Sequence, residues 1–370
     1  MVRLGDVATY INGYAFKSTD WSNEGIPIIR IQDLTGNSYQ ANRYNGKYDP
    51  KYEVNYGDVL ISWSASLGVY VWTGETAVLN QHIFKVQFDK ADVDKDFFVH
   101  QVECILNNAS SEAHGATMKH LTKPIFDALP FYLPNVDEQK KIANELNRVT
   151  SLISLRKQQL SKLDELVKSR FIEMFGDPVS NPNELPTKPL SELGSLDRGR
   201  SKHRPRNDPK LLGGPYPLIQ TGEVSNAGLY ITEYQNTYSE LGLKQSKMWN
   251  AGTLCITIAA NIAQTAMLTF DACFPDSGVG FIHSDEVSAI YMHYWFSFFQ
   301  KILDEQAPQV AQKNINLKIL SELQVTIPSK EKQKDFVTFV EQVNKSKLEI
   351  QKSLENLETL KKALMQKYFG

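Results

Sequence analysis

The chain has 370 residues, and 40 Lys and Arg against 42 Asp and Glu give a formal net charge of −2, so a case for nucleic-acid binding must rest on local patches. No window of 18 residues is both apolar and uncharged, which argues against a transmembrane helix. Three scattered cysteines, Cys104, Cys255 and Cys273, argue against a disulfide framework or a zinc site and favour a cytoplasmic location.

Residues 1–136 are expected to form a first globular domain of mixed α and β structure. Short apolar runs alternate with turn residues such as Asn12-Gly13, a pattern typical of strands and tight turns. The stretch KDFFVHQVECILNN (95–108) has the apolar spacing of a helix.

Residues 137–176 form a predicted first spacer helix. Apolar residues recur at alternating steps of four and three over about five heptads, which is the seam of a coiled coil. The seam positions are Ile142, Leu146, Val149, Ile153, Leu160, Leu163 and Val167, with Arg156 and Arg170 as interruptions. The helix is expected to stop at Phe175-Gly176, because its glycine stands at the end and Pro178 follows.

Residues 177–330 are expected to form a second mixed α/β domain, because its segments match those of the first domain in order. The matched pairs are RLGDVATYINGYAF (3–16) with PLSELGSLDRGRSK (189–202), GIPIIRIQDLTGN (25–37) with GPYPLIQTGEVSN (214–226), NYGDVLISWSASLG (55–68) with NAGTLCITIAANIA (250–263), and, more loosely, VLNQHIFKV (78–86) with FPDSGVGFI (274–282). The chain is therefore an internal repeat.

Residues 331–370 form a predicted second spacer helix, which a shift of 194 residues places on the first. Gln139-Lys140 meets Gln333-Lys334 at this shift, and both helices end in Phe-Gly. The second seam is Phe336, Val340, Val343, Ile350, Leu354, Leu357 and Leu364, with Lys347 and Lys361 as interruptions. Two helices of equal length with matched seams are expected to pair antiparallel, which puts the two domains at opposite ends of a coiled coil with a pseudo-two-fold axis.

Catalytic motifs are missing from the sequence. It has no P-loop, no G-x-G-x-x-G, no G-x-S-x-G and no aminomethyltransferase tetrapeptide, and its seven histidines do not fall at metal-ligand spacings. Glu138 and Lys140 echo the end of a metal-dependent nuclease motif, but Glu138 opens a helix, where an acidic residue complements the helix dipole. We expect no catalytic residues and no bound metal.

Recognition surface remains. The stretch DRGRSKHRPRNDPK (197–210) is nearly unmixed in sign and reads as a loop suited to phosphate contacts, although such a run is often only a solvated face. Its candidate DNA contacts are Arg198, Arg200, Lys202, His203, Arg204 and Arg206. The first domain offers Lys17, Arg30, Gln32, Asp33, Ser64, Asn80, Gln81, His82 and Lys119, and the second also offers Gln220, Glu223, Asn261, Lys313 and Asn314. Each of these singly has a structural role as an alternative to base contact.

These features together resemble the DNA-specificity subunit of Type I restriction–modification systems. The resemblance rests on the opening RLGDVA, the runs IPIIRIQDL, GDVLIS and LNQHIFKV, the EQKKIA entry into a coiled coil, and the order domain, helix, domain, helix. It covers the whole chain, although the second domain lacks the Gly-Asp pair and the serines of the first.

The resemblance implies a non-catalytic subunit that reads a bipartite DNA target with two domains, with the helix pair as the spacer between them. It implies two modification subunits that use S-adenosylmethionine, and restriction subunits that use ATP and magnesium, as partners, with no cofactor in this chain and no membrane. Two alternatives are a protein scaffold without DNA contact and a single-chain nuclease or methyltransferase, for which the sequence offers no motif.

Overall fold

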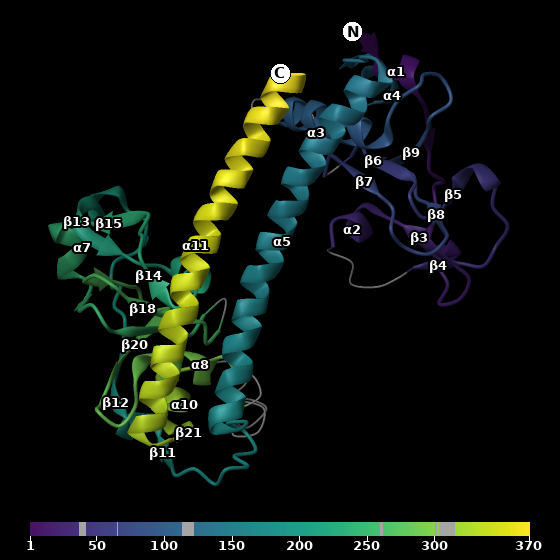
Figure 1. The fold of residues 1–370 in the computed structure, drawn as a ribbon. Coiled ribbons are helices and arrows are strands. Elements are labelled where there is room, and N and C mark those ends of the chain that lie inside the picture. Colours follow the sequence, from purple (N-terminus) through teal and green to yellow (C-terminus); the bar gives the residue numbers. More distant parts are fainter. Residues whose placement is uncertain (37–41, 65, 113–121, 260–261, 300–301, 303–314) are drawn as a thin grey trace. The chain divides into compact units, whose positions relative to one another are not determined.

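The computed structural model describes residues 1–36, 42–64, 66–112, 122–259, 262–299, 302 and 315–370 (Figure 1). The chain divides into two compact units, one formed by Met1–Gln158 with Gln351–Gly370 and the other by Gln159–Ile350. Within the described ranges no helix has the length and apolar character needed to cross a membrane.

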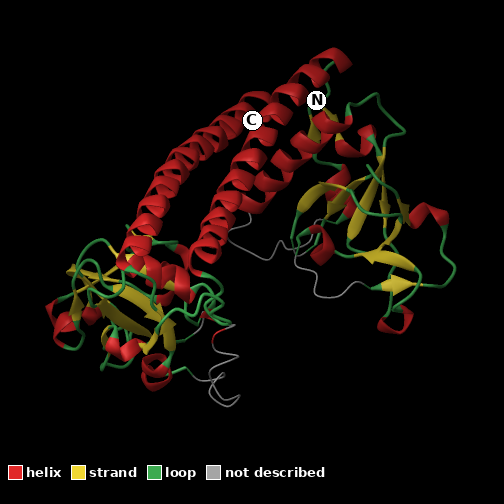
Figure 2. Ribbon diagram, turned by 60° about the horizontal axis from the view of Figure 1, so that its bottom comes forward, coloured by secondary structure: helices red, strands yellow, loops and turns green. Residues whose placement is uncertain are grey.

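The described residues of the first unit form two four-stranded sheets and one two-stranded sheet. Figure 2 shows the strands of both units in yellow. An antiparallel sheet has the order β2-β9-β6-β7, a mixed sheet has the order β4-β3-β8-β5, and β1 pairs with β10. The strands are β1 (Val2–Arg3), β2 (Thr9–Asn12), β3 (Ile26–Ile29), β4 (Arg43–Tyr44), β5 (Glu53–Val54), β6 (Val59–Ser62), β7 (Gly68–Val71), β8 (Ala77–Leu79), β9 (Ile83–Gln87) and β10 (Pro130–Phe131). The helices outside the spacer are α1 (Leu4–Val7), α2 (Ile31–Leu34), α3 (Lys95–Glu112) and α4 (Lys123–Asp127).

Among its described residues, the second unit repeats this topology with one additional strand, β14. Its sheets have the orders β12-β20-β17-β18-β14 and β15-β13-β19-β16, and β11 pairs with β21. The strands are β11 (Thr187–Pro189), β12 (Gly194–Arg198), β13 (Leu212–Leu218), β14 (Tyr230–Ile231), β15 (Asn236–Tyr238), β16 (Met248–Trp249), β17 (Leu254–Thr257), β18 (Thr265–Leu268), β19 (Ala272–Cys273), β20 (Gly278–His283) and β21 (Gln324–Thr326). The helices are α6 (Thr221–Asn226), α7 (Glu240–Lys244), α8 (Ala289–Phe296) and α10 (Leu317–Glu322).

The repeat holds at single hydrogen bonds. Gly57 and Gly252 both have positive φ, +90° and +88°, and each donates its N–H across the turn, to Trp72 and Leu268, at 2.8 Å. In both units glycine is favoured at this turn, because a residue with a Cβ atom is sterically strained at positive φ. The internal repeat and the mixed α/β class predicted from the sequence are therefore confirmed.

Two helices of 40 residues run through the units: α5 (Val136–Phe175) and α11 (Lys330–Phe369). In the first unit Arg156 Nε donates to Ser353 Oγ at 3.2 Å, and Lys157 Nζ lies 3.0 Å from Glu358 Oε1. The Tyr368 hydroxyl donates to Glu145. Because numbers fall along α11 as they rise along α5, the helices pair antiparallel in this unit.

The same antiparallel pairing occurs in the second unit. Lys347 Nζ donates to Asp164 Oδ1 at 2.6 Å, and the Phe336 ring lies 5.6 Å from that of Phe171. A charged residue at a seam position is thus paired with a carboxylate on the facing helix, which offsets part of the cost of placing it there.

The seam residues serve each unit's core as well as the helix pair. Ile142, Leu146, Val149 and Leu364 are buried in the core of the first unit, and Val167, Phe336, Val340 and Val343 in that of the second. Ile350 is also buried, whereas Ile153, Leu160, Leu163, Leu354 and Leu357 are half-buried. The seam is therefore driest where the helices meet the domains.

The two Phe-Gly ends have equivalent aromatic partners. The ring centroid of Phe175 lies 5.1 Å from that of Tyr291 on α8, and the ring of Phe369 lies 5.5 Å from that of Phe97 on α3. The last aromatic residue of α5 therefore packs on α8, and that of α11 packs on α3. The two ends are equivalent in the repeat. The edge-on geometry of both pairs is the favoured one for aromatic rings.

Candidate nucleic-acid interface

Two parallel strands end at the same edge of the mixed sheet in the first unit. β3 and β8 run parallel, with Ile29 opposite Leu79. The chain leaves β3 at Arg30 and β8 at Asn80, and the Asn80 N–H donates to the Ile29 carbonyl at 3.1 Å. Polar residues far apart in the sequence are thereby brought together, as happens at the carboxyl edges of parallel strands in general.

Arg30 has an aromatic partner at this edge. Its guanidinium carbon lies 5.2 Å from the centroid of the Trp21 ring, and Trp21 is 44% exposed. The Arg30 N–H donates to Asp33 Oδ2 at 2.7 Å, which caps the short helix α2. Asp33, a predicted base reader, therefore has a local structural task, while Gln32 beside it is half-buried.

The loop after β8 is hydrogen-bonded to the segment that follows β2. The Gln81 N–H donates to the Tyr14 carbonyl at 2.9 Å. A Cβ atom at Gly13 would collide with the Asn80 carbonyl, so the close approach of the two segments depends on glycine there. Asn80 and Gln81 are half-buried, and His82 is exposed.

Other predicted contacts of the first domain lie in different settings. The ring of His82 lies 5.3 Å from that of Trp63, whose Nε1 donates to Asn12 Oδ1 at 3.2 Å. The side chain of Lys17 is exposed, whereas Ser64 is only 5% exposed. Burial withdraws Ser64 from direct contact with a duplex in this conformation.

The second unit builds the same edge from different residues. β13 and β19 are parallel, with Leu218 opposite Cys273, and the Ile219 N–H donates to the Cys273 carbonyl at 2.8 Å. A Cβ atom at Gly199 would collide with the Pro275 carbonyl, just as one at Gly13 would with that of Asn80. The loop 274–277 is therefore the counterpart of the loop after β8, one residue from the match that the sequence predicted.

Gln220 takes the place of Arg30. Its N–H donates to Glu223 Oε2 at 3.1 Å, the same cap that Asp33 provides in the first unit. Gln220 is exposed. Glu223, another predicted base reader, thus also holds its own helix.

The basic loop is exposed but partly neutralised. Its six predicted contacts, Arg198, Arg200, Lys202, His203, Arg204 and Arg206, all have exposed side chains. Asp276 receives two of them: Arg204 Nη2 lies 3.3 Å from Asp276 Oδ2, and Arg206 pairs with Asp276 Oδ1. Arg198 donates to the Asp276 carbonyl. Asp276 therefore anchors the loop over the edge of β19.

A second aspartate anchors the start of the loop. Lys247 Nζ donates to Asp197 Oδ2 at 2.6 Å, and Arg200 Nη2 lies 3.9 Å from the same oxygen. The Lys247 hydrogen bond is the main cause that holds the pKa of Asp197 below its usual value. The backbone N–H of Lys210 and then His203 lower the pKa of Asp208 in the same way. These carboxylates stay charged at neutral pH and fix the loop electrostatically.

A cavity of about 390 Å³ lies between the basic loop and α6. Arg206 and Asn207 line it from the loop, Gln220 from the strand edge, and Asn236 from β15. Guanidinium and amide groups are the donors and acceptors that recognise base edges and phosphates. The arrangement therefore suits contact with a duplex.

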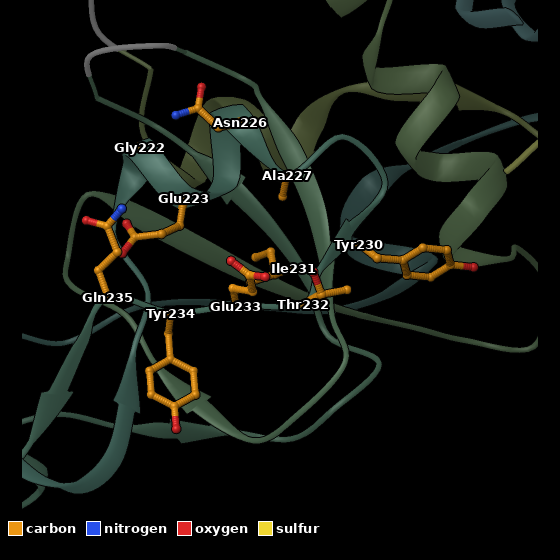
Figure 3. A pocket seen from close by; sticks show the side chains of 10 residues that line it. All are labelled: Gly222, Glu223, Asn226, Ala227, Tyr230, Ile231, Thr232, Glu233, Tyr234 and Gln235. Carbon is orange, nitrogen blue, oxygen red and sulfur yellow. The ribbon is translucent and has the colours of Figure 1, made fainter. Parts of the chain in front are cut away.

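A separate cavity of about 570 Å³ lies on the other side of α6 (Figure 3). Glu223 and Glu233 line it, together with Tyr230, Tyr234 and Gln235, and no Lys or Arg is among its described lining residues. Two carboxylates without a cation repel phosphate, so this cavity does not extend the phosphate-binding surface.

Four predicted contacts, Lys119, Asn261, Lys313 and Asn314, lie outside the described residues. Conversely, sequence reasoning missed Trp21, Asn207, Asn236 and Asp276. Asn207 stands inside the quoted basic stretch and was a visible signal. Asn236 and Asp276 lie distant in sequence, and only the fold brings them to the edge, whereas Trp21, nine residues before Arg30, lies outside every motif quoted above.

Comparisons with known proteins place the chain in a family. A family model described as the Type I restriction modification DNA specificity domain matches residues 1–165 and again residues 182–359. The EcoBI specificity subunit of Escherichia coli is 24% identical over 388 residues, covering 96% of this chain and 81% of that protein. The MjaVIII specificity subunit of Methanocaldococcus jannaschii is 21% identical over 407 residues, covering 99% and 90%.

Solved structures share the fold. A chain from work on the structural basis underlying complex assembly and conformational transition of the type I R-M system has a TM-score of 0.57 at 16% identity, covering 100% of this chain and 96% of that one. The Type I restriction–modification system S subunit from M. genitalium has a TM-score of 0.52 at 13% identity, covering 100% and 95%. Because the family model matches both repeats and most of the chain, the protein belongs to the Type I restriction–modification DNA specificity family.

Proposed function

We propose that this specificity subunit reads a bipartite, gapped DNA sequence, with one half-site for each domain. The observation that carries the proposal is that one parallel-strand edge is built twice and furnished with different polar side chains. Arg30 and Asn80 directly follow the two strands in the first unit, whereas Gln220 and Asp276 lie in the segments two and three residues after the strands in the second. The same backbone arrangement with different side chains suits two half-sites of different sequence.

The basic loop supplies sequence-independent affinity in this proposal. Its exposed arginines lie beside the cavity that Gln220 lines. Phosphate contacts by such residues set the register of a protein on a duplex, while neighbouring polar groups read the bases. Asp276 keeps two of the arginines ordered before DNA arrives, which lowers the entropy lost on binding.

The chain acts without catalytic residues of its own and docks two modification subunits, which supply S-adenosylmethionine chemistry, in the cytoplasm. Restriction subunits that use ATP and magnesium complete the complex. Exposed leucines on the spacer helices support two equivalent docking places: Leu166 on α5 and Leu360 on α11 are 47% and 46% exposed. They are equivalent positions of the repeat, so the same surface recurs once in each unit.

The test is a selection from a random duplex library by the chain assembled with its modification subunits. The selected sequences are expected to contain two fixed half-sites separated by a gap of constant length and unspecified sequence. Recovery of unenriched sequences by an assembled complex would contradict the proposal and favour a protein scaffold without DNA contact. The chain alone, incubated with magnesium or S-adenosylmethionine, is expected to leave DNA uncut and unmethylated.

A further inference from the structure

Arg30 and Gln220 occupy the same place in the two repeats but present different hydrogen-bonding groups. Arg30 directly follows β3, Gln220 stands two residues after the last residue of β13, and each has its N–H held by an acidic side chain three residues on, at 2.7 and 3.1 Å. The backbone of both positions is therefore fixed in the same way. What differs between the two domains is the side chain projected from this frame.

The guanidinium of Arg30 is placed for a ligand. Across the described part of the chain no carboxylate pairs with it, in contrast to Arg204 and Arg206, which share the single carboxylate of Asp276. It lies over the half-exposed ring of Trp21 at 5.2 Å. Stacking on an aromatic face restricts a guanidinium while leaving its five N–H donors free for hydrogen bonds.

Gln220 lies at the edge of a cavity. It is exposed and lines the cavity of about 390 Å³ that Asn207, Asn236 and Arg206 also line. Its amide carries both a donor and an acceptor, whereas a guanidinium carries donors alone. The two positions thus have complementary preferences for base edges.

We propose that this shared position selects one base in each half-site: Arg30 reads a guanine in the first, and Gln220 reads an adenine in the second. Guanine presents two acceptors, O6 and N7, in the major groove, which match the paired donors of arginine. Adenine presents the N7 acceptor and the N6 donor, which match the amide of glutamine. The inference deepens the proposed function and rests on it.

The test repeats the library selection with Arg30→Gln and Gln220→Arg in the assembled complex. Arg30→Gln is expected to lower the preference for guanine at one position of the first half-site by about 10- to 100-fold, since the amide sets its own acceptor against one of the two guanine acceptors, and to leave the second half-site unchanged. Gln220→Arg is expected to shift one position of the second half-site from adenine towards guanine. Trp21→Leu retains Arg30 and is expected to weaken the same guanine preference.

Arg148→Gln is the matched control, because it removes the same charge from an exposed position on α5. It is expected to leave every base preference intact. If the wild-type complex selects a gapped motif and Arg30→Gln and Gln220→Arg leave all its positions unchanged, the base assignment fails and the proposed function stands. A first half-site without guanine also overturns the assignment. If the wild-type complex selects no motif, the proposed function itself fails.

Discussion

At the scale of single residues, one glutamine in each unit joins the domain to its spacer helix. Gln139 Oε1 accepts from the Asp94 N–H at 2.8 Å, and its Nε2 donates to the Pro134 carbonyl at 2.8 Å. Gln333 repeats this: Oε1 accepts from the Ser288 N–H at 2.9 Å, and Nε2 donates to the Pro328 carbonyl at 3.0 Å. The repeated glutamine of the sequence therefore has a structural cause, whereas the lysine after it is exposed in both units.

Gln333→Leu is expected to lower the free energy of unfolding by about 2–4 kcal/mol, because it leaves the half-buried N–H of Ser288 and two carbonyls, those of Glu286 and Pro328, without this partner. Denaturant unfolding followed by tryptophan fluorescence measures the loss. Lys334→Ala changes the exposed neighbour and is expected to stay within about 0.5 kcal/mol. Equal stability of the two variants would show that the hydrogen bonds of the Gln333 side chain contribute nothing to the free energy of unfolding.

A second residue sets a pH response. His293 Nδ1 lies 2.9 Å from Thr265 Oγ1 on β18. Burial lowers the pKa of His293 to about 4, a hydrogen bond from the ring to the Thr265 backbone opposes this, and the charges of Lys347 and Lys168 add to the lowering. The folded protein therefore keeps this imidazole neutral at pH values where the unfolded chain protonates it.

The free energy of unfolding is accordingly expected to fall as the pH drops from about 6.5 to about 4, by up to about 3 kcal/mol from this residue. The unfolded state binds the extra proton across this window, so acid favours unfolding. His293→Gln cannot titrate and is expected to lose that part of the pH dependence. Urea unfolding of both proteins at pH 7.5 and 5 measures it, and parallel pH profiles would contradict the assignment.

At the scale of elements, the helices were far easier to predict than the sites between strands. The 3-4 spacing of residues such as Leu146 and Val340 predicts the buried face of a helix directly, because residues three and four apart lie on the same side of a helix. The parallel pairing of β13 with β19 rests on Leu218 and Cys273, 55 residues apart and joined at one position. No local pattern encodes such a pairing.

The basic loop shows the same limit for the candidate site. Its positive charge and its exposure could be predicted from the sequence, since Arg200, Arg204 and Arg206 stand close together, and their side chains are exposed in the structure. Its partial neutralisation was not, because Asp276 lies 70 residues or more along the chain and reaches the loop only through the fold. The charges within a loop's own sequence therefore do not predict the net charge of the surface that it forms in the folded protein.

Replacing Arg200, Arg204 and Arg206 with glutamine is expected to weaken DNA binding by the complex and to reduce the slope of log K against log salt by about 1 for each phosphate that is no longer neutralised. The motif selected from a library is expected to stay the same, since phosphates carry no sequence. Binding titrations at several salt concentrations measure the slope. A slope equal to that of the Arg148→Gln control would remove the loop from the interface.

At the scale of the whole molecule, the repeat explains why one chain carries two readers. The second half repeats the sheet topology of the first, the hydrogen bonds of its glutamine (Gln139 and Gln333) and its edge of parallel strands. The polar side chains at the edge differ, as with Arg30 and Gln220. Readers tied to one paired spacer bind DNA as a single multivalent event when the duplex matches their separation.

The central claim is that the helix pair sets the gap between half-sites, and its most direct test lengthens that pair. One heptad is inserted into α5 between Gln158 and Gln159 and one into α11 between Ile350 and Gln351, at the junctions of the two units, where the contacts within each unit are kept. Seven residues add about 10 Å, or about 3 base pairs. The library selection is expected to return both half-sites unchanged with a gap longer by about that amount. An unchanged gap would contradict the account.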